Sequence, residues 1–340
     1  MSAQTLDLTT LDGWLRQHVP AFEGSLSAEK FAGGQSNPTF KLTAGENQYV
    51  LRRKPPGQLL ASAHMVDREY RVISALQSSN VPVPATIALC EDDSVIGSMF
   101  YVMEYLDGRV FWDPALEELS REERLACYEE MNRVLAALHS VDINTVGLAD
   151  YGKPGNYFER QVGRWTKQYR ASETETLFAM ERLIEWLPEH IPDDDGHIGL
   201  VHGDYRLDNL MWHPTEPKII AVLDWELSTL GHPIADLAYQ IMAWQLPRGA
   251  GINGMAGLDR ESLGIPSDSD YIATYCAHTG REAIDNWDFY LAFCFFRLAA
   301  IVQGVKKRAL DGNASNADAA SQGDLVEPLV NMGVNAIKGR

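Results

Sequence analysis

The feature of this sequence that most restricts its fold is a polar loop with apolar residues at both ends, over residues 200–210, LVHGDYRLDNL. The apolar ends anchor the loop in a core, and His202, Asp204 and Asn209 are three of its polar members. Fifteen residues after Asn209, an apolar strand predicted over 218–223 ends at Asp224. Because the loop is short, we expect Asp204 and Asn209 to face one cleft.

The chemistry that needs these residue types at this spacing is phosphoryl transfer. H-x-D-x-x-x-x-N is the spacing of the catalytic loop in protein kinases. The reaction requires an aligned hydroxyl and neutralised phosphate charge rather than covalent help from the protein. Asp204 suits the base that accepts the hydroxyl proton, and Asn209 and Asp224 suit the hard oxygen ligands that Mg²⁺ prefers. The alternative is a turn that the same side chains merely stabilise, and the strand that ends at Asp224 disfavours it.

The first hundred residues alternate in a way that predicts an antiparallel sheet. An amphipathic helix is expected within 1–25, with apolar residues at helical spacing. Three adjacent strands, one helix and two further strands follow, and this order favours an α+β unit with a helix on one face of the sheet. The predicted strands lie at 30–32, 39–42, 48–52, 86–90 and 98–104, and the helix at 63–77.

The remainder of the chain is mostly helical by its periodicity. Helices are predicted over 121–140, 155–171, 174–187, 235–246, 268–279, 284–309 and 323–337, with one strand cluster at 198–224. We therefore expect an α+β, protein-kinase-like fold of two lobes. The small antiparallel-sheet N-lobe, with the N-terminal helix, takes residues 1–105 and binds the nucleotide. The larger helical C-lobe takes 106–340 and carries the catalytic loop and the acceptor site.

Two segments of the N-lobe are candidates for contacts with phosphate. In the loop from Gly33 to Pro38, backbone N–H groups of Gly34, Ser36 and Asn37 could approach a phosphate closely, although an ordinary hairpin turn has a similar composition. In the strand YVLRRK over 49–54, Arg52 occupies the place of the lysine that pairs with phosphates in kinases. Lys54 takes this place if the register differs by two, and a solvated strand end is the plain alternative.

An acidic residue on the following helix suggests the partner of this arginine. Glu69 lies on the same helical stripe as the apolar Met65, Val72 and Leu76. A carboxylate that faces a core needs a cation, and Arg52 is the natural candidate, as in the Lys–Glu pair of kinases. The alternative is a glutamate at the edge of the stripe that reaches solvent.

These motifs resemble a known family. HGDYRLDN followed by LDWELSTLGHPIADLAY is similar to the aminoglycoside phosphotransferase and choline kinase superfamily, and closest to the bacterial branch related to kinase-like domains fused to acyl-CoA dehydrogenases. The resemblance covers residues 25–310. It implies ATP and Mg²⁺ as cofactors and a small-molecule hydroxyl compound as acceptor. It also implies roles for individual residues: Asp204 as the base, Asn209 and Asp224 as metal ligands, Arg206 on the transferred phosphate, His202 and Asp236 as braces of the catalytic loop, and the backbone of Glu104 and Leu106 at the adenine.

The acceptor itself is the least constrained part of this interpretation. The resemblance favours a hydroxyacyl-CoA or a similar hydroxyl compound over an aminoglycoside or choline. Trp287, Tyr290 and Arg297 share one long helix and could line an acceptor pocket, although aromatic residues at helical spacing usually belong to the core. Glu226 could reach a second metal ion or the substrate. The run Asp193–Asp195 is either a solvated loop or a lip that binds a cation.

Composition limits the alternatives. The net charge of −18 disfavours nucleic acid and anionic membranes as partners. We expect no membrane-spanning helix, because no run of about 18 apolar residues is uninterrupted, and we expect a cytoplasmic protein whose four cysteines are free thiols. A catalytically inactive nucleotide-binding regulator of the same fold is the main alternative. A protein kinase is disfavoured by the short segment from Asp224 to Asp236 and the lack of an A-P-E motif.

Overall fold

The structure is a computed structural model that describes residues 6–20, 22–31, 37–55, 64–249, 253–312 and 323–338. The chain divides into two compact units, each discontinuous in sequence. The first, which we name the sheet unit, comprises Met1–Val110, Asn144–Leu148 and Asn209–Ser228. The second, the helical unit, comprises Phe111–Ile143, Ala149–Asp208 and Thr229–Arg340.

The sheet unit contains a five-stranded sheet in the order β1-β2-β3-β5-β4. All neighbouring strands are antiparallel, as predicted. The first strand is the exception to the prediction: it runs over Leu26–Lys30 and not 30–32, because Leu26 and Ala28 alternate toward the core while Glu29 is exposed. The strands are β1 Leu26–Lys30, β2 Thr39–Ala44, β3 Asn47–Arg53, β4 Thr86–Cys90 and β5 Phe100–Glu104.

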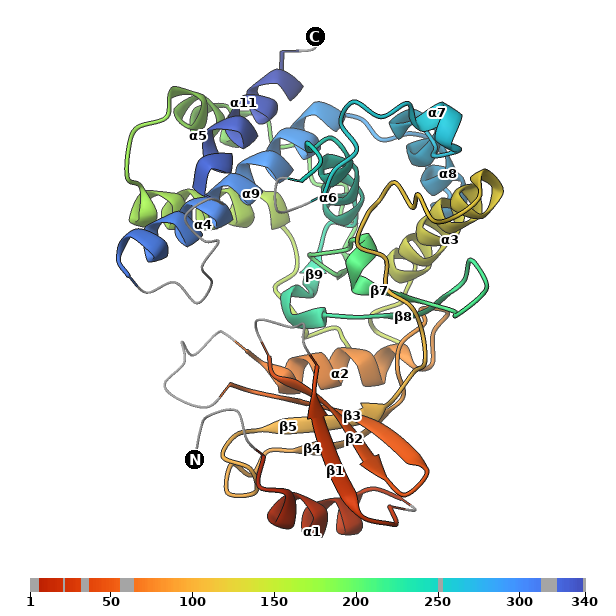
Figure 1. Ribbon diagram of the computed structural model, residues 1–340. Helices are drawn as coiled ribbons and strands as arrows, with labels where there is room; N and C mark the ends of the chain where they lie inside the picture. Colours follow the sequence, from red (N-terminus) through yellow and green to blue (C-terminus); the bar gives the residue numbers. More distant parts are fainter. Residues whose placement is uncertain are drawn as a thin grey trace. The chain divides into compact units, whose positions relative to one another are not determined.

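Two helices cover this sheet, on opposite faces (Figure 1). Helix α1, Leu8–His18, begins at the Asp7 cap and buries Leu11 and Leu15 against the inward residues of β2, β3 and β5. Helix α2, Val66–Leu76, packs on β4 and β5 from the other side. The sequence predicted a helix on only one face of the sheet, and the structure shows that α1 covers the other face.

A hairpin from the middle of the chain completes the sheet unit. Strands β7, Leu210–Trp212, and β8, Ile219–Val222, pair antiparallel. The backbone N–H of Val222 donates to the carbonyl of Pro82 at 2.8 Å, and Trp212 forms a β-bridge with Arg109. These contacts bring the short 3₁₀ helix η2, Trp225–Leu227, against α2. The strand end that carries Asp224 is thereby fixed inside this unit.

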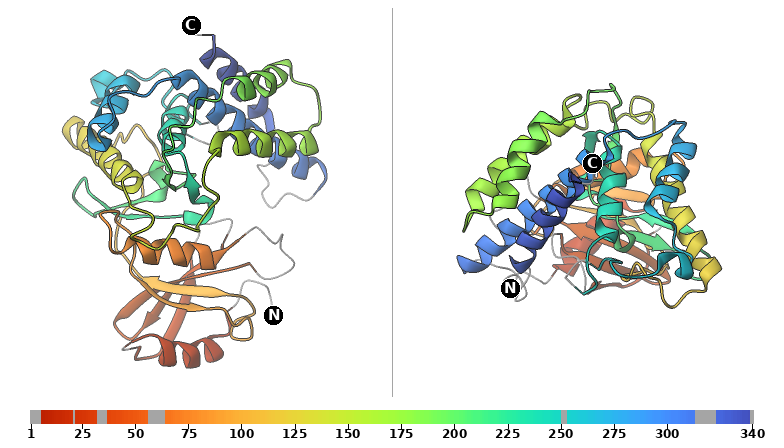
Figure 2. Two further views of the ribbon diagram at one scale, coloured as in Figure 1. Left: turned by 180° about the vertical axis from the view of Figure 1, so that it is seen from behind. Right: turned by 90° about the horizontal axis from the view of Figure 1, so that it is seen from above.

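The helical unit is built around helix α9, Trp287–Leu310. Figure 2 shows α4, α5 and α11 alongside it, and α6 also packs on it. By length and composition α9 could cross a membrane. A core helix can pass the same test, and 83% of the most apolar window of α9 is buried inside the protein. The other helices are α3 Arg121–His139, α4 Tyr157–Ser172, α5 Phe178–Glu189, α6 Ile234–Trp244, α7 Arg260–Leu263, α8 Asp268–Thr279 and α11 Val326–Ala336.

A small two-stranded sheet carries the polar loop of the helical unit. Strands β6, Gly199–Val201, and β9, Thr229–Gly231, pair antiparallel and are almost wholly buried. The loop begins directly after β6, and β9 leads into α6. The α+β class is therefore confirmed, with most of the described strands in the sheet unit and most of the described helices in the helical unit.

We predict that Gly231→Ala destabilises the helical unit, whereas Gly163→Ala does not. A Cβ at Gly231 would lie 2.5 Å from the Tyr157 ring, so the ring must shift, at a cost of about 1–3 kcal/mol. A Cβ at Gly163, inside α4, meets no atom within 4 Å, and alanine should stabilise this helix by about 0.5–1 kcal/mol. Urea unfolding of both variants measures the difference, and equal midpoints would contradict the packing described here.

Candidate functional site

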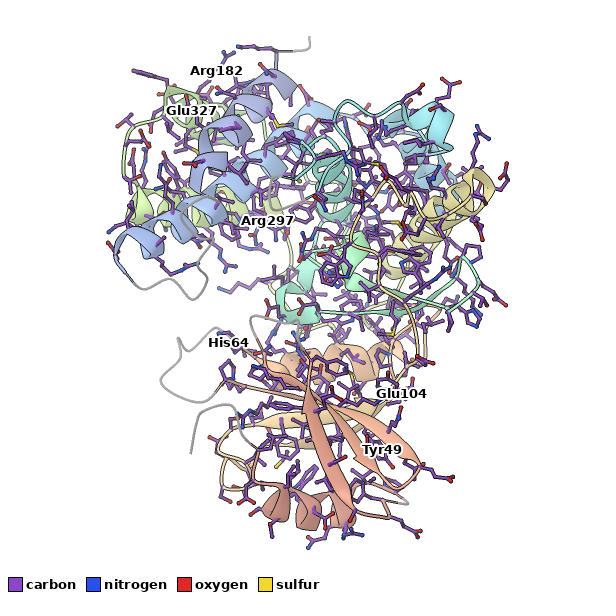
Figure 3. The ribbon with its side chains drawn as sticks, viewed as in Figure 1. Tyr49, His64, Glu104, Arg182, Arg297 and Glu327 are labelled. Carbon is purple, nitrogen blue, oxygen red and sulfur yellow. The ribbon has the colours of Figure 1, made fainter. Side chains whose placement is uncertain are left out.

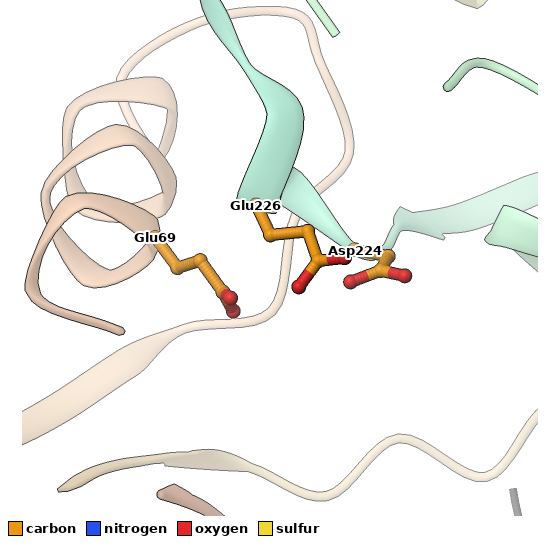
Figure 4. Close-up of side chains that lie close together, drawn as sticks. All are labelled: Glu69, Asp224 and Glu226. Carbon is orange, nitrogen blue, oxygen red and sulfur yellow. The ribbon is translucent and has the colours of Figure 1, made fainter. Parts of the chain in front are cut away.

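Three carboxylates of the sheet unit converge between α2 and the end of β8. One oxygen from each of Glu69, Asp224 and Glu226 lies within 4.8 Å of the other two, and Figure 4 shows Glu69 extending from its helix toward the other two side chains. Asp224 has a left-handed backbone conformation, with φ of 63°. Aspartate tolerates this conformation better than most residues, and such backbones concentrate at functional sites.

Arg52 of β3 holds this cluster together. Its Nη2 lies 2.5 Å from Oδ1 of Asp224, and its Nε lies 2.7 Å from Oε2 of Glu69. The predicted pairing of Arg52 with Glu69 is confirmed. Burial alone would lower the pKa of Arg52, but the negative charges of Glu69, Asp224 and Glu226 raise it instead. The guanidinium therefore stays charged at any physiological pH.

The neighbouring Arg53 does not belong to the carboxylate cluster. Successive side chains of a strand point to opposite faces, so Arg53 points away from Arg52 and lies over the Phe40 ring, 5.7 Å from its centroid. Its Nη1 donates to the carbonyl of Ile96 at 3.3 Å. The arginine run is thus not a solvated strand end, and the register that assigns Arg52, not Lys54, to the cluster is the observed one.

Glu69 is the most deeply buried carboxylate of the cluster, with 1% of its surface exposed. It accepts hydrogen bonds from Asn37 Nδ2 at 2.8 Å and from the Tyr101 hydroxyl at 3.2 Å. Desolvation raises the pKa of Glu69 to about 7, against the opposing charge of Arg52. The carboxylates of Asp224 and Glu226 act in the same direction as desolvation.

The donor set of this cluster fits a hard divalent cation. Carboxylate oxygens are the ligands that Mg²⁺ selects. Asp224 and Glu226 are both partly exposed, so a metal ion held by them could also contact phosphate oxygens of a ligand. Asn209 lies next to this position, since its carbonyl accepts a hydrogen bond from Leu223 N at 2.8 Å. Glu226 was predicted only as a residue that could reach a second metal ion or the substrate, and the structure brings it into the same cluster.

In the helical unit, Asp236 braces the loop that precedes Asp204. Its two carboxylate oxygens accept the backbone N–H groups of His202, at 2.6 Å, and Gly203, at 2.8 Å. His139 of α3 lies 3.3 Å from the same carboxylate. Burial would raise the pKa of Asp236, but these hydrogen bonds and the nearby histidines outweigh burial and lower it. The predicted pair of His202 and Asp236 is thus brought together.

Asp204 itself is held by charged and polar side chains. Arg206 Nε lies 2.9 Å from Oδ1 of Asp204, and Arg206 Nη2 lies 3.2 Å from Oδ2 of Asp208. The Tyr239 hydroxyl also bonds to Asp204, and burial together with this carboxylate raises the pKa of Tyr239. The backbone N–H of Asp204 donates to Nδ1 of His202 at 3.2 Å.

Arg297 adds a second cation to this region. It lies on α9 (Figure 3) with 7% of its surface exposed, and its Nη2 donates to the carbonyl of Gly203 at 2.7 Å. Its guanidinium lies over the Tyr239 ring, 5.1 Å from the centroid. Sequence reasoning named Arg297 as an acceptor-pocket candidate and missed its backbone contact, and it did not find His139 at all. The only signal for His139 was its place at the end of a predicted helix.

The other predicted residues have varied positions. Gly34 and Ser36 lie outside the described residues, whereas Asn37 is fully buried and bonds to Glu69 instead of facing outward. The Glu104 side chain accepts the N–H of Ala85 at 2.8 Å, and Leu106 lies two residues beyond the end of β5. Tyr290 lies seven residues before Arg297 on α9 and stacks on His232, so these two α9 residues serve different regions.

Comparison with known proteins gives this geometry a context. The sequence pattern of a family described as the phosphotransferase enzyme family matches residues 27–271. Acyl-CoA dehydrogenase family member 10 of Mus musculus is 50% identical over 310 residues, which are 91% of this chain and 29% of that protein. Acyl-CoA dehydrogenase family member 11 of Homo sapiens is 44% identical over 337 residues, 98% of this chain and 43% of that protein. The chain thus spans less than half the length of these relatives.

Solved structures show the same fold. A “putative aminoglycoside phosphotransferase” from Ralstonia eutropha superposes with a TM-score of 0.91 at 53% identity, covering 98% of this chain and 99% of that one. Spectinomycin phosphotransferase, solved with ADP and spectinomycin, superposes with a TM-score of 0.64 at 14% identity over 97% of this chain and 98% of that one. At this low identity the second likeness concerns the fold alone.

We predict that Glu69 makes the stability of the metal-free protein fall as pH rises. Its pKa of about 7 in the folded protein exceeds its ordinary value of 4.5, so its contribution is present below pH 4.5 and is lost as pH rises through about 7. Between pH 5 and 8 this loss is on the order of 2 kcal/mol. Urea unfolding with a chelator should show a weaker pH dependence for Glu69→Gln, while the exposed Glu29→Gln retains that of the unmutated protein. An unchanged dependence in Glu69→Gln would refute the assignment.

Proposed function

This chain belongs to the phosphotransferase enzyme family, and we propose that it transfers the γ-phosphoryl group of ATP to a hydroxyl of a small molecule. The observation that carries the proposal is the arrangement of the acidic residues. Asp204 is held by Arg206 and Tyr239 on a loop braced by Asp236. Asp224 is held by Arg52 next to Asn209.

In the proposed reaction, Asp204 is the base. The acceptor oxygen forms a bond to the γ-phosphorus while the bond from that phosphorus to the β–γ bridging oxygen breaks, and ADP leaves. The hydroxyl proton passes to the carboxylate of Asp204 and then to solvent. Arg206 holds Asp204 in place and lies two residues from it, where its charge favours the transferred phosphoryl oxygens.

Asn209 and Asp224 would hold Mg²⁺, with Glu226 available as a further oxygen ligand. The ion would neutralise charge on the β- and γ-phosphate oxygens. Arg52 orients Asp224. Glu69 in turn orients Arg52 through their ion pair, and Glu69 is itself held by a hydrogen bond from Asn37. The same Arg52 can fork onto phosphate oxygens as the usual lysine would. Backbone groups of Glu104 and Leu106 at the end of β5 would meet the adenine.

A hydroxyacyl-CoA or a chemically similar hydroxyl compound is the acceptor class that we propose. Two named relatives are acyl-CoA dehydrogenase family members, and this chain matches part of each. A polypeptide that carries both activities would handle related acyl compounds. Solved phosphotransferases of this fold include complexes with ADP, AMP-PNP, hygromycin B and spectinomycin, which supports a nucleotide and a small hydroxyl compound as the two ligands.

The second candidate function is a nucleotide-binding regulator without catalysis. The features that favour it are Arg52 in place of the usual lysine and a glycine loop that lacks the G-x-G-x-x-G spacing. The features that oppose it are Asp204, Asn209 and Asp224, because all the side chains required for transfer are present.

The decisive experiment is a mass-spectrometric screen. The protein is mixed with ATP, Mg²⁺ and a panel of hydroxyacyl-CoAs, sugars, amino alcohols and aminoglycosides. A phosphate mass gain on one class supports the proposed function and identifies the acceptor. ATP binding without any transfer favours the regulator, and failure to bind ATP contradicts both functions.

We predict that Asp204→Asn lowers kcat by a factor of about 10²–10⁴, because the amide cannot accept the proton. The dissociation constant of Mg·ATP should change little, since the base contacts the acceptor. Asp285→Asn, an exposed residue of the same unit, is the matched control and should retain full activity. Loss of nucleotide binding together with turnover in Asp204→Asn would contradict its role as the base.

We predict that Asp224→Asn weakens binding of Mg·ATP about tenfold or more, because a charged metal ligand is replaced by a neutral one. Calorimetric titration with and without Mg²⁺ measures the effect. The exposed Asp93→Asn in the same unit should behave as the unmutated protein. An Asp224→Asn variant that keeps the full metal dependence of nucleotide binding would remove Asp224 from the metal site.

A further inference from the structure

The exposed side of helix α4 carries an open groove lined by positive charge, which we name the α4 groove. Its volume is about 970 Å³, and all its lining residues belong to the helical unit. Among the described residues, the lining contains one carboxylate, Glu159, and four cations, Lys153, Arg160, Arg164 and Lys167. The net charge of the chain is −18, so this local excess of positive charge opposes the charge of the protein as a whole.

The protein itself does not neutralise the cations of the α4 groove. Within the described part of the chain, none of the four forms an ion pair with a carboxylate. Other surface cations of the same unit are paired, for example Arg170 with Glu181 at 2.5 Å and Arg248 with Asp113 at 2.6 Å. Like charges on one helix face repel each other, so an anion bound in the groove would relieve this repulsion.

The spacing of the cations gathers them along one side of the helix. Arg164 follows Arg160 by four residues and Lys167 follows Arg164 by three, so their side chains lie on one face of α4. At the rise of an α-helix the three span about 10 Å. Gly163 lies among them, and a Cβ there would meet no atom within 4 Å, so the floor of the groove is open to a ligand.

Arg160 fixes one end of the groove. Its Nη2 donates to the carbonyl of Lys153 at 2.6 Å, and its Nη1 donates to the carbonyl of Pro154 at 3.3 Å. These bonds hold the segment that precedes α4 against the helix and keep Lys153 beside the other cations. A guanidinium has five N–H donors, so Arg160 retains donors for a bound anion.

Trp165 connects the α4 groove to the loop that carries Asp204. The Arg164 guanidinium lies 5.3 Å from the centroid of the Trp165 ring, and the Arg297 guanidinium lies 5.7 Å from it. Arg297 in turn donates to the carbonyl of Gly203, the residue before Asp204. The groove thus belongs to the same unit as the proposed base, and none of its residues belongs to the carboxylate cluster of the sheet unit.

The density of positive charge in the groove favours phosphate over carboxylate as the ligand group. A phosphate monoester carries about 1.5–2 negative charges at neutral pH, whereas each acidic side chain of a peptide carries one. The planar fork of a guanidinium also matches two oxygens of one phosphate. Several cations within about 10 Å suit a small molecule that carries two or more phosphate groups.

We propose that the α4 groove is a second phosphate site, which binds a molecule with two or more phosphate groups in addition to the nucleotide that donates the phosphoryl group. Arg164 and Lys167 are the main ligands, because both are exposed and unpaired. Arg160 and Lys153 complete the site. The phosphates belong either to the acceptor, which the connection through Trp165 would allow, or to a separate molecule. Binding to the groove does not depend on phosphoryl transfer.

The test is calorimetric titration of the whole chain with Mg²⁺ and saturating AMP-PNP, so that the proposed nucleotide site is occupied. The probes are tripolyphosphate, coenzyme A, pantetheine, which is the phosphate-free part of coenzyme A, and a hexaglutamate peptide. Tripolyphosphate and coenzyme A should bind, more weakly as the salt concentration rises, and pantetheine should not. Joint substitution of Arg164→Gln and Lys167→Gln should raise the dissociation constants of both phosphate probes about tenfold or more.

A charge-matched control separates the groove from the overall charge of the protein. Arg121 and Arg182 are exposed cations of the same unit outside the groove, so Arg121→Gln with Arg182→Gln removes the same charge and should leave both dissociation constants unchanged. The inference is overturned if neither phosphate probe binds, or if the variant at residues 164 and 167 binds them as tightly as the unmutated protein does. Hexaglutamate that binds as tightly as tripolyphosphate overturns the assignment to phosphate.

Kinetics with the acceptor found in the screen separate the two sources of phosphate. If the acceptor carries the phosphates, tripolyphosphate competes with it at fixed free Mg²⁺, and the variant at residues 164 and 167 raises KM for the acceptor but not for ATP. If a separate molecule carries them, tripolyphosphate binds together with the acceptor, and KM for the acceptor is the same in both proteins. Either result supports the second phosphate site. Lack of transfer to every acceptor overturns the proposed function, and the calorimetric result then decides the inference by itself.

Discussion

The buried guanidinium of Arg52 is the interaction on which the candidate nucleotide site depends. Glu69 is almost completely buried, and Asp224 and Glu226 lie within 4.8 Å of it. Three carboxylates this close repel one another, and their desolvation is costly. Arg52 contacts two of them directly, and its charge makes their association possible without a metal ion. Its removal would leave a buried, uncompensated negative charge, which is more damaging than the loss of an exposed ion pair.

In the helical unit the central buried group is a carboxylate instead of a guanidinium. Asp236 is a buried carboxylate, and it is stabilised by two backbone N–H groups of the loop that it positions. Arg297 holds the carbonyl of Gly203 from the opposite side. The N–H groups of His202 and Gly203 and the carbonyl of Gly203 are thus all held, so the loop is fixed immediately before Asp204. A carboxylate placed in this way loses little conformational freedom when a ligand binds.

Much of the fold was predictable because the apolar periods are strong. The antiparallel sheet, α2 and most helix positions follow from apolar patterns that only one kind of packing satisfies. The first strand was misplaced because LSAEK over 26–30 has only two apolar residues, and it is held in the sheet by pairing with β2 along its whole length. The covering of the second sheet face by α1 also could not be predicted, since an amphipathic helix can bury its apolar side against many surfaces.

For the site, the sequence by itself determined which residues are chemically suited to phosphoryl transfer. Asp204, Asn209 and Asp224 have a spacing that depends on local chain geometry alone, and the Glu69 stripe demands a cation. Tertiary structure decided which partners these residues have. Arg52 contacts Asp224 across 172 positions, and His139 contacts Asp236 across 97. Contacts between distant segments depend on how whole elements pack, and the periodicity of a single segment contains no information about its neighbours in space.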